Sequence, residues 1–255
     1  MHYTIGVLCL LISFHCCLSV PASPRDYKVF ADLPTCSTEE DQLSDCIKQI
    51  FNTLNPRLKD GNTDLKIPPY EPLVLNRTSF QYSSGNVNGR ITMKNAKIHG
   101  FSANTAKEVN AKYKDGKVKL RFLTFLPKLN IAGQYKADLQ VNQLQIKPKG
   151  DFNVTLTNVE VTTITDGEVY EKDGHRFFRM KNIDSNPKIG DLHIKANGIF
   201  QDPELDKIAL DVANQYWRDI YGIMLPETRQ YWQPLLLRIF NEVLELVPID
   251  AFLKD

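Results

Sequence analysis

The chain has 255 residues, of which 42% are hydrophobic, and its 31 basic residues nearly balance its 30 acidic ones. This length allows one large domain with a substantial buried core. A formal net charge of +1, with no basic stripe, excludes a nucleic-acid binder held by bulk electrostatics.

Residues 1–22 are typical of a secretory signal peptide. The apolar run Ile5–Val20 contains no Asp, Glu, Lys or Arg, and Val20-Pro21-Ala22 offers small residues before a cleavage point at Ser23. A transmembrane anchor is the competing interpretation, but the run is too short and no basic flank follows it. We therefore expect a single domain over residues 23–255 that is secreted, extracellular and without stable membrane insertion.

Two cysteines remain after the signal is removed. Cys9, Cys16 and Cys17 leave with it, whereas Cys36 and Cys46 stay. In an oxidising compartment this pair predicts a disulfide. A metal site is the alternative, but two thiols without a nearby histidine make a poor zinc site. We expect no metal and no cofactor.

Two glycosylation sequons occur in the mature chain, Asn76-Arg77-Thr78 and Asn153-Val154-Thr155. Phe152, Val154 and Leu156 alternate with polar residues, so Asn153 should point away from the apolar face of a strand. We expect glycans at Asn76 and Asn153.

The mature chain opens with a helical pattern and then changes period. Apolar residues between Leu43 and Leu54 have helical spacing, and Pro56 and Gly61 should close this helix. The segment Ile67–Leu73 holds three prolines and predicts an extended connector.

Strict alternation of apolar and polar residues follows. It covers residues 118–122, 129–135, 137–141, 152–156, 159–161 and 192–194. Turns are indicated by Asp115-Gly116, Lys149-Gly150, Asp166-Gly167, Asp173-Gly174 and Asn186-Pro187. The pattern predicts a meander of roughly seven or eight antiparallel strands with one apolar face.

A long helix should end the chain. Asp202 is a good N-cap and Pro203 a good first helical residue. Apolar residues then come in pairs every four positions, so the stripe drifts by about 40° per pair. A curved sheet wrapped around the helix would cover such a stripe, whereas a flat sheet would cover it only in part. One helix over residues 203–247 would span about 67 Å, which exceeds the roughly 45 Å diameter of a compact globule.

Gly222, Pro226 and Pro234 predict a bend in this helix. We therefore expect an α+β fold: one long, bent C-terminal helix held inside a strongly curved antiparallel sheet, in an elongated molecule.

Recognisable catalytic motifs are missing. The sequence has no Gly-x-Ser-x-Gly elbow, His-Glu-x-x-His pair, phosphate-binding glycine loop or dinucleotide fingerprint. His99, His175 and His193 are most simply turn or solvated strand residues without a base–orienter constellation. We expect no catalytic residues and no enzyme.

Aromatic and apolar residues are abundant on the predicted sheet face and helix. They are compatible with an ordinary filled core or with an elongated apolar cavity of ligand size. The residue pattern by itself favours the filled core, because cavities cost stability.

The mature chain resembles the takeout and juvenile-hormone-binding protein family of insect secreted proteins. The resemblance rests on ordered segments over nearly all of residues 30–250: Leu33–Cys36, Leu43–Ile47, Pro69–Leu73, Leu129–Tyr135, Gly150–Val159, and Asn214–Trp217 through Val247–Ile249. It implies a haemolymph-type carrier with an internal apolar tunnel for a fatty acid, terpenoid or related lipid, and it reverses the preference for a filled core. Cys36 and Cys46 correspond to the family's N-terminal disulfide.

One departure from the family concerns the ligand. Carriers dedicated to juvenile hormone have a second cysteine pair, which is absent from this mature chain. The resemblance is therefore to the takeout-like branch.

On this basis we expect a monomeric carrier of a small lipophilic ligand, with a cell-surface receptor as a candidate further partner. Tyr135, Trp217, Tyr221 and Trp232 are candidates to orient the ligand, since each joins an apolar body to a polar group. The expected tunnel lining is Phe122, Ile131, Tyr135, Leu139, Val154, Leu156, Phe177, Tyr216, Trp217, Tyr221, Trp232 and Phe240.

Two alternatives stay open. One is a secreted signalling or interaction protein with a filled core and no ligand. The other is a peripheral membrane-lipid binder, for which Pro248–Leu253 is the best candidate for an exposed apolar rim.

Overall fold

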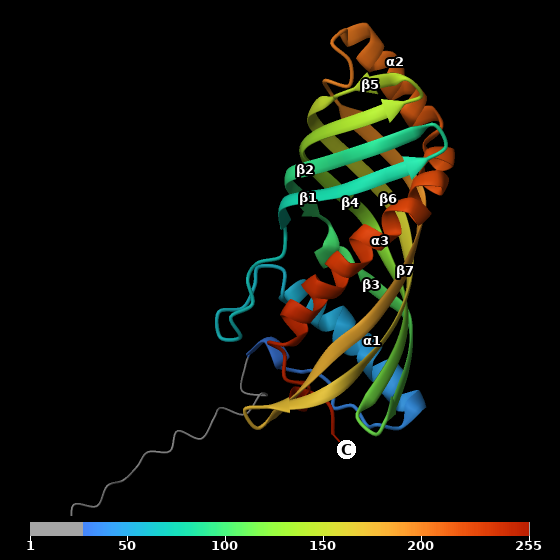
Figure 1. Ribbon diagram of the computed structural model, residues 1–255. Helices are drawn as coiled ribbons and strands as arrows, with labels where there is room; N and C mark the ends of the chain where they lie inside the picture. Colours follow the sequence, from blue (N-terminus) through green and yellow to red (C-terminus); the bar gives the residue numbers. More distant parts are fainter. Residues whose placement is uncertain (1–27, 255) are drawn as a thin grey trace, which may run out of the picture.

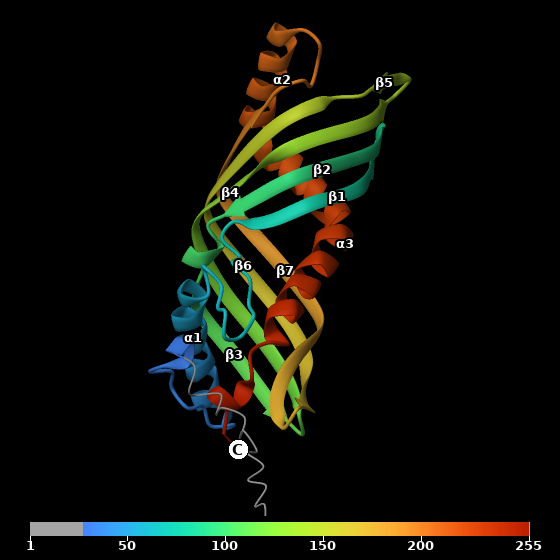
Figure 2. The same cartoon turned by 90° about the vertical axis from the view of Figure 1, so that its left-hand side faces the viewer.

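The computed structural model describes residues 28–254, which form an elongated body with a curved sheet around a C-terminal helix (Figures 1 and 2). The predicted signal peptide lies outside the described residues. The helices are α1 (Glu40–Arg57), α2 (Pro203–Gln215) and α3 (Trp217–Leu244), with short 3-10 turns η2 (Lys28–Phe30), η3 (Phe101–Ala103) and η4 (Ile249–Ala251). The strands are β1 (Leu73–Ser84), β2 (Val87–His99), β3 (Thr105–Lys114), β4 (Lys117–Val141), β5 (Leu144–Ile146), β6 (Lys149–Lys172) and β7 (His175–Ala196).

The strands form one antiparallel sheet in the order β1-β2-β4-β6-β7, with β3 and β5 paired to β4. The predicted α+β class, with a large antiparallel sheet and a long C-terminal helix, is confirmed. The strands are longer than the alternating segments suggested, because neighbouring segments join into single strands.

Three of the expected turns lie inside strands. Lys149 begins β6, the pair Asp166-Gly167 is a register shift within β6, and Pro187 continues β7. A register shift bends a strand without ending it. Proline is tolerated in β7 because this strand is at the edge of the sheet, where a missing N–H breaks no ladder bond. The pairs Asp115-Gly116 and Asp173-Gly174 are turns, as predicted.

The C-terminal helix begins where the sequence predicts, but it breaks elsewhere. The Asp202 carboxylate accepts a hydrogen bond from the Glu204 backbone N–H at 2.8 Å and caps α2. The helix is interrupted at Tyr216, and α3 then runs without a break through Pro226 and Pro234. The expected single helix is therefore two.

Both prolines of α3 are tolerated because they lie on its solvent side. Gly222, Pro226, Gln230, Pro234 and Arg238 are four residues apart and all exposed. A proline at position i leaves the carbonyl of residue i−4 without its helical partner. Here those carbonyls belong to Gly222 and Gln230 on the same exposed stripe, where water can hydrate them.

Side chains of α2 and α3 pair with the free edge of β7. The Asn214 side chain accepts from the Ile194 N–H at 2.7 Å and donates to the Ile194 carbonyl at 2.9 Å. Asn241 makes the same two bonds with Met180, both at 2.9 Å. The Tyr221 hydroxyl donates to the Pro187 carbonyl at 3.0 Å. An asparagine amide carries one acceptor and donors like those of a peptide group, so these residues replace a neighbouring strand.

The opposite flank of α3 faces β1. The rings of Phe80 on β1 and Tyr231 on α3 lie 6.3 Å apart between centroids. The helix thus bridges the two ends of the curled sheet, from β7 to β1 (Figure 2). We call the sheet face that carries Phe80 the inner face, and the opposite one the outer face.

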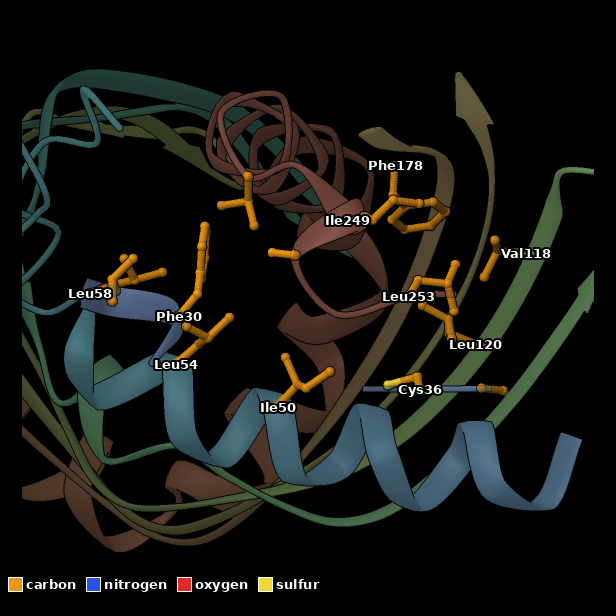
Figure 3. Packing of buried hydrophobic residues seen from close by; sticks show 14 of the residues in the cluster. Phe30, Cys36, Ile50, Leu54, Leu58, Val118, Leu120, Phe178, Ile249 and Leu253 are labelled. Carbon is orange, nitrogen blue, oxygen red and sulfur yellow. The ribbon is translucent and has the colours of Figure 1, made fainter. Parts of the chain in front are cut away.

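The fully buried core lies at the α1 end of the body (Figure 3). Ile50 and Leu54 of α1, and Leu58 just after it, belong to one cluster with residues of the sheet and of the C-terminal tail, including Phe178 and Ile249. Burial of such side chains stabilises the fold by about 1.5–3 kcal/mol each.

The predicted disulfide joins Cys36 to Cys46, with 5.5 Å between their Cα atoms, and it ties the N-terminal segment to α1. The C-terminal tail pairs with the same segment, because the Cys36 N–H donates to the Phe252 carbonyl at 2.6 Å. Ile249, Ala251 and Leu253 are buried in the core. The tail therefore does not form the exposed apolar rim that we considered for membrane binding.

The proline-rich connector is held by polar side chains. The Tyr70 hydroxyl donates to the backbone carbonyl and, at 2.8 Å, the side-chain oxygen of Asn55 in α1. The Glu71 carboxylate accepts from the backbone N–H groups of Gly100 and, at 3.0 Å, Ser102. The connector therefore links α1 to the loop after β2.

We expect Asn241→Ala to lower the free energy of unfolding by about 1–3 kcal/mol, because it leaves two backbone groups of Met180 without partners. Gln230→Ala, on the exposed stripe of the same helix, should cost less than about 0.5 kcal/mol. Urea unfolding followed by circular dichroism measures both. Equal losses would contradict the assigned role of Asn241.

We expect a loss of stability in alkali that depends on Tyr70. Burial, and then the nearby Glu71 carboxylate, raise the pKa of Tyr70 to about 12 from an ordinary 10.0. The unfolded chain releases this proton first, so stability should fall as the pH rises from 10 to 12. Tyr70→Phe should be less stable at neutral pH but lose less over this window. Parallel unfolding curves of the two proteins from pH 9 to 12 would contradict the assignment.

Candidate functional site

Apolar side chains of the sheet are packed differently at the two ends of the body. At the α1 end Leu120, Leu126 and Val159 are buried, at most 7% exposed. Toward the α2 end the corresponding side chains remain partly accessible. These half-buried residues are Ile131, Tyr135, Leu139, Val154 and Leu156. The inner surface at this end is therefore apolar but incompletely covered by the helix.

The register places these residues on one face. Ile98 of β2 lies opposite Ile131 of β4, which lies opposite Val154 of β6 and, beyond it, Ile194 of β7. Residues directly opposite across neighbouring strands share a face. Gly133, two positions after Ile131 on β4, lies close to the backbone of β2: a Cβ atom on Gly133 would be only 2.8 Å from the Ala96 Cα. This glycine permits the close approach of β2 and β4.

Helix α3 supplies the facing surface. The residues that face the sheet are Met224, Thr228, Trp232 and Leu236. Each lies two positions from a residue of the exposed α3 stripe that contains Pro226 and Pro234, which places it about 200° around the helix from that stripe. All four are half-buried. The apolar pairs of the sequence include Met224, Trp232 and Leu236, but the expected lining included only Trp232 of the residues on this helix face. Phe80 of β1 is a further inner-face residue that the expected lining left out.

Two of the candidate polar groups already have protein partners. The Tyr135 hydroxyl donates to the Asn197 carbonyl at 3.0 Å, and the Tyr221 hydroxyl donates to the edge of β7. Burial, and for Tyr135 the Asp206 carboxylate as well, raises the pKa of both hydroxyls, while Arg229 opposes the shift at Tyr221. Both are neutral donors to backbone at physiological pH.

The two tryptophans differ in environment. Trp217 is buried, lies against Tyr221 with 6.5 Å between ring centroids, and is covered by the Arg218 guanidinium at 4.4 Å. The indole N–H of Trp232 donates no hydrogen bond within residues 28–254. Arg229, one helical turn before Trp232, has a buried Nε atom that is likewise without a partner among the described residues.

Other residues of the expected lining lie elsewhere. Phe177 stacks beside Tyr170 at 5.9 Å on the outer face, while its neighbour Phe178 enters the core. Alternation along β7 makes only one of these two phenylalanines point inward. Tyr216, at the helix break, is 50% exposed, and Phe240 is 40% exposed. Phe122 is half-buried at the α1 end, where its ring centroid lies 5.6 Å from that of Phe51 in α1. It is therefore away from the half-buried inner-face residues around Ile131.

Helix α2 is not covered by the sheet, contrary to the expectation of a fully wrapped stripe. Leu205, Ile208 and Val212 form a helical stripe and are 49–58% exposed. Figure 2 shows α2 at the end of the body remote from α1, with β5 at the same end. Apolar side chains are therefore exposed on α2 as well, at the same end of the body.

Two surface depressions lie outside this region. One, of about 490 Å³, is on the outer face of the sheet, and the other, of about 390 Å³, is beside α1 around Asn52. Neither is the expected apolar tunnel. Within the described residues no cluster of three potential metal ligands occurs, and no helix there is long and apolar enough to cross a membrane.

The family model described as haemolymph juvenile hormone binding protein (JHBP) matches residues 9–254. The chain is 25% identical over 221 residues to the circadian clock-controlled protein daywake of Drosophila melanogaster, covering 84% of this chain and 85% of that protein. The Drosophila yakuba protein of the same name is 23% identical, with 87% of each covered. The crystal structure of Takeout 1 from Epiphyas postvittana superposes with a TM-score of 0.69 at 18% identity, over 87% of this chain and 99% of that one. Sequence and fold agree, and the chain belongs to the haemolymph juvenile hormone binding protein family, which includes the takeout-like proteins that it resembles.

Proposed function

We propose that this protein is a secreted carrier that binds one small elongated lipophilic ligand, such as a fatty acid or terpenoid, between the inner face and α3. The observation that carries the proposal is the group of half-buried inner-face residues Ile131, Tyr135, Leu139, Val154 and Leu156, with the facing residues on α3. Family membership supports a binding protein over an enzyme.

The energetics favour a long apolar ligand. A sixteen-carbon chain that buries about 400 Å² would gain on the order of 10 kcal/mol before the costs of association. Micromolar or tighter affinity would remain after those costs. Water that now contacts these half-buried residues would be displaced, which is the source of this gain.

A polar head group would bind near Trp232. Its indole N–H and the Arg229 Nε lie three residues apart on one helix, where side chains are neighbours. Neither of these two N–H groups donates a hydrogen bond within residues 28–254, and the Arg229 Nε is also buried. An acceptor group such as a carboxylate or ester carbonyl would satisfy them, whereas Tyr135 and Tyr221 already donate to backbone.

The α2 end is the proposed entrance. The exposed stripe of Leu205, Ile208 and Val212 offers apolar contacts beside the uncovered part of the inner face. At the α1 end the core is filled and closed by the tail, so a ligand would not pass there.

The first test is native mass spectrometry of the glycan-trimmed protein secreted by insect cells, with lipid extraction of the same sample. We expect one co-purifying lipid per chain. Added palmitic acid at a hundredfold excess over its dissociation constant should stabilise the protein by about 2.7 kcal/mol and raise the melting temperature by several degrees. A bare mass, with no stabilisation by a panel of fatty acids and terpenoids, would favour a filled-core interaction protein.

A matched pair of variants tests the head-group site. Trp232→Phe keeps an aromatic ring but removes the N–H, so we expect palmitic acid to bind about tenfold more weakly. Trp217→Phe, on the same helix but buried beside Tyr221, should leave the affinity unchanged. Competition against a fluorescent fatty acid measures both. Equal effects, or none for Trp232→Phe, would contradict the assigned head-group position.

A further inference from the structure

The outer face of the sheet carries a depression at the α2 end. Lys97, Ala132, Asn153 and Lys195 lie directly opposite one another on β2, β4, β6 and β7 and form one row across the sheet. Each of these residues is the sequence neighbour of a residue in the inner-face row that contains Ile131, so their side chains point to the outer face. The small side chain of Ala132, between the longer Lys97 and Asn153, leaves a hollow of about 490 Å³. This volume is in the range of small-ligand sites, roughly 300–1,000 Å³.

The lining of this depression combines polar side chains with the apolar residues Ala132, Phe152 and Ala196, and it contains a sequon. Asn95, Lys97, Gln134, Asp151, Lys195 and Asn197 contribute to its walls. These residues supply amide, ammonium and carboxylate groups, which can both donate to and accept from hydroxyl groups. Asn153 belongs to the sequon Asn153-Val154-Thr155 and lies within the same lining.

The Asn153 side chain is held with its nitrogen free. The Asn130 amide donates to the Asn153 Oδ1 at 2.7 Å and to the Thr155 Oγ1 at 3.0 Å. The Asn153 Nδ2, the atom to which a glycan would be attached, donates no hydrogen bond within residues 28–254. The hydrogen bond from Asn130 therefore fixes the orientation of the Asn153 amide, and a sugar attached to its Nδ2 would replace no hydrogen bond within residues 28–254.

We propose that Asn153 carries an N-linked glycan whose first sugars lie in this outer-face depression. A lipid-linked oligosaccharide diphosphate supplies the sugar: the bond from Nδ2 to the sugar C1 forms, the bond from C1 to the diphosphate oxygen breaks, and the amide proton leaves. The Cys36–Cys46 disulfide is consistent with passage through an oxidising compartment, where such donors are found. The site is on the face away from α3 and does not depend on the proposed carrier function.

The second sequon provides an internal control. Asn76 lies on β1, next to the irregularity of β2 between Lys94 and Lys97. It is exposed and lies outside the depression. A glycan at Asn76 should therefore extend into solvent, whereas one at Asn153 should be shielded at its first sugars.

The test uses the full-length protein secreted by cells whose glycans are kept in the high-mannose form. Endoglycosidase H cuts between the two core N-acetylglucosamines, and glycopeptide mass spectrometry follows each site over time. We expect Asn153 to be occupied, and its cleavage in the folded protein to be about tenfold slower than after unfolding. Asn76 should show little difference between the folded and unfolded protein.

A pair of double variants tests the walls. Lys97→Ala with Lys195→Ala should speed cleavage at Asn153 in the folded protein without changing its occupancy. Lys119→Ala with Lys188→Ala removes the same charge at exposed positions away from the depression and should change nothing. An unoccupied Asn153, or cleavage of the folded protein at the same rate as the unfolded one, would overturn the proposal.

Discussion

The structure depends on how the free edge of β7 is satisfied. A curled sheet that does not close on itself exposes unpaired backbone groups at its edges, and these invite association with other chains. Here the side-chain amides of Asn214 and Asn241 imitate a neighbouring strand, each pairing with both backbone groups of one β7 residue. These bonds hold the helices at a fixed distance from β7, and the contact between Tyr231 and Phe80 closes the other flank.

This arrangement divides the body into two ends with different roles. At the α1 end, the disulfide, the tail and α1 fill the space between sheet and helix, and the buried side chains there supply the hydrophobic stabilisation. At the α2 end no further element of residues 28–254 fills it, and inner-face residues such as Ile131 and Val154 are only half-buried there. Hydrophobic burial at the α1 end offsets the stability that incomplete packing at the α2 end costs. The unfilled end is where a ligand can add apolar burial.

The period of two along a strand lets the same segment serve two surfaces. In β6, Val154 points toward α3 and belongs to the proposed ligand surface, while its neighbour Asn153 points to the outer depression. A slip of one residue would exchange these faces, so one register determines both. The Asn130 amide, which holds Asn153 and Thr155 from the neighbouring strand, fits only this register.

Sequence by itself determined the features that depend on local chemistry: the helix start at Asp202, the apolar faces of the strands and helices, the cysteine pair and the α+β class. Periodicity reports which side of an element is apolar, and this held for Trp232 and Val154. Only the tertiary structure decided where elements continue, because hydrogen bonds from distant strands carry β6 and β7 through Asp166-Gly167 and Asn186-Pro187. It also placed Phe177 outward, left the α2 stripe exposed and moved the helix break to Tyr216. Local patterns cannot show what covers a surface, since covering requires a partner from elsewhere in the chain.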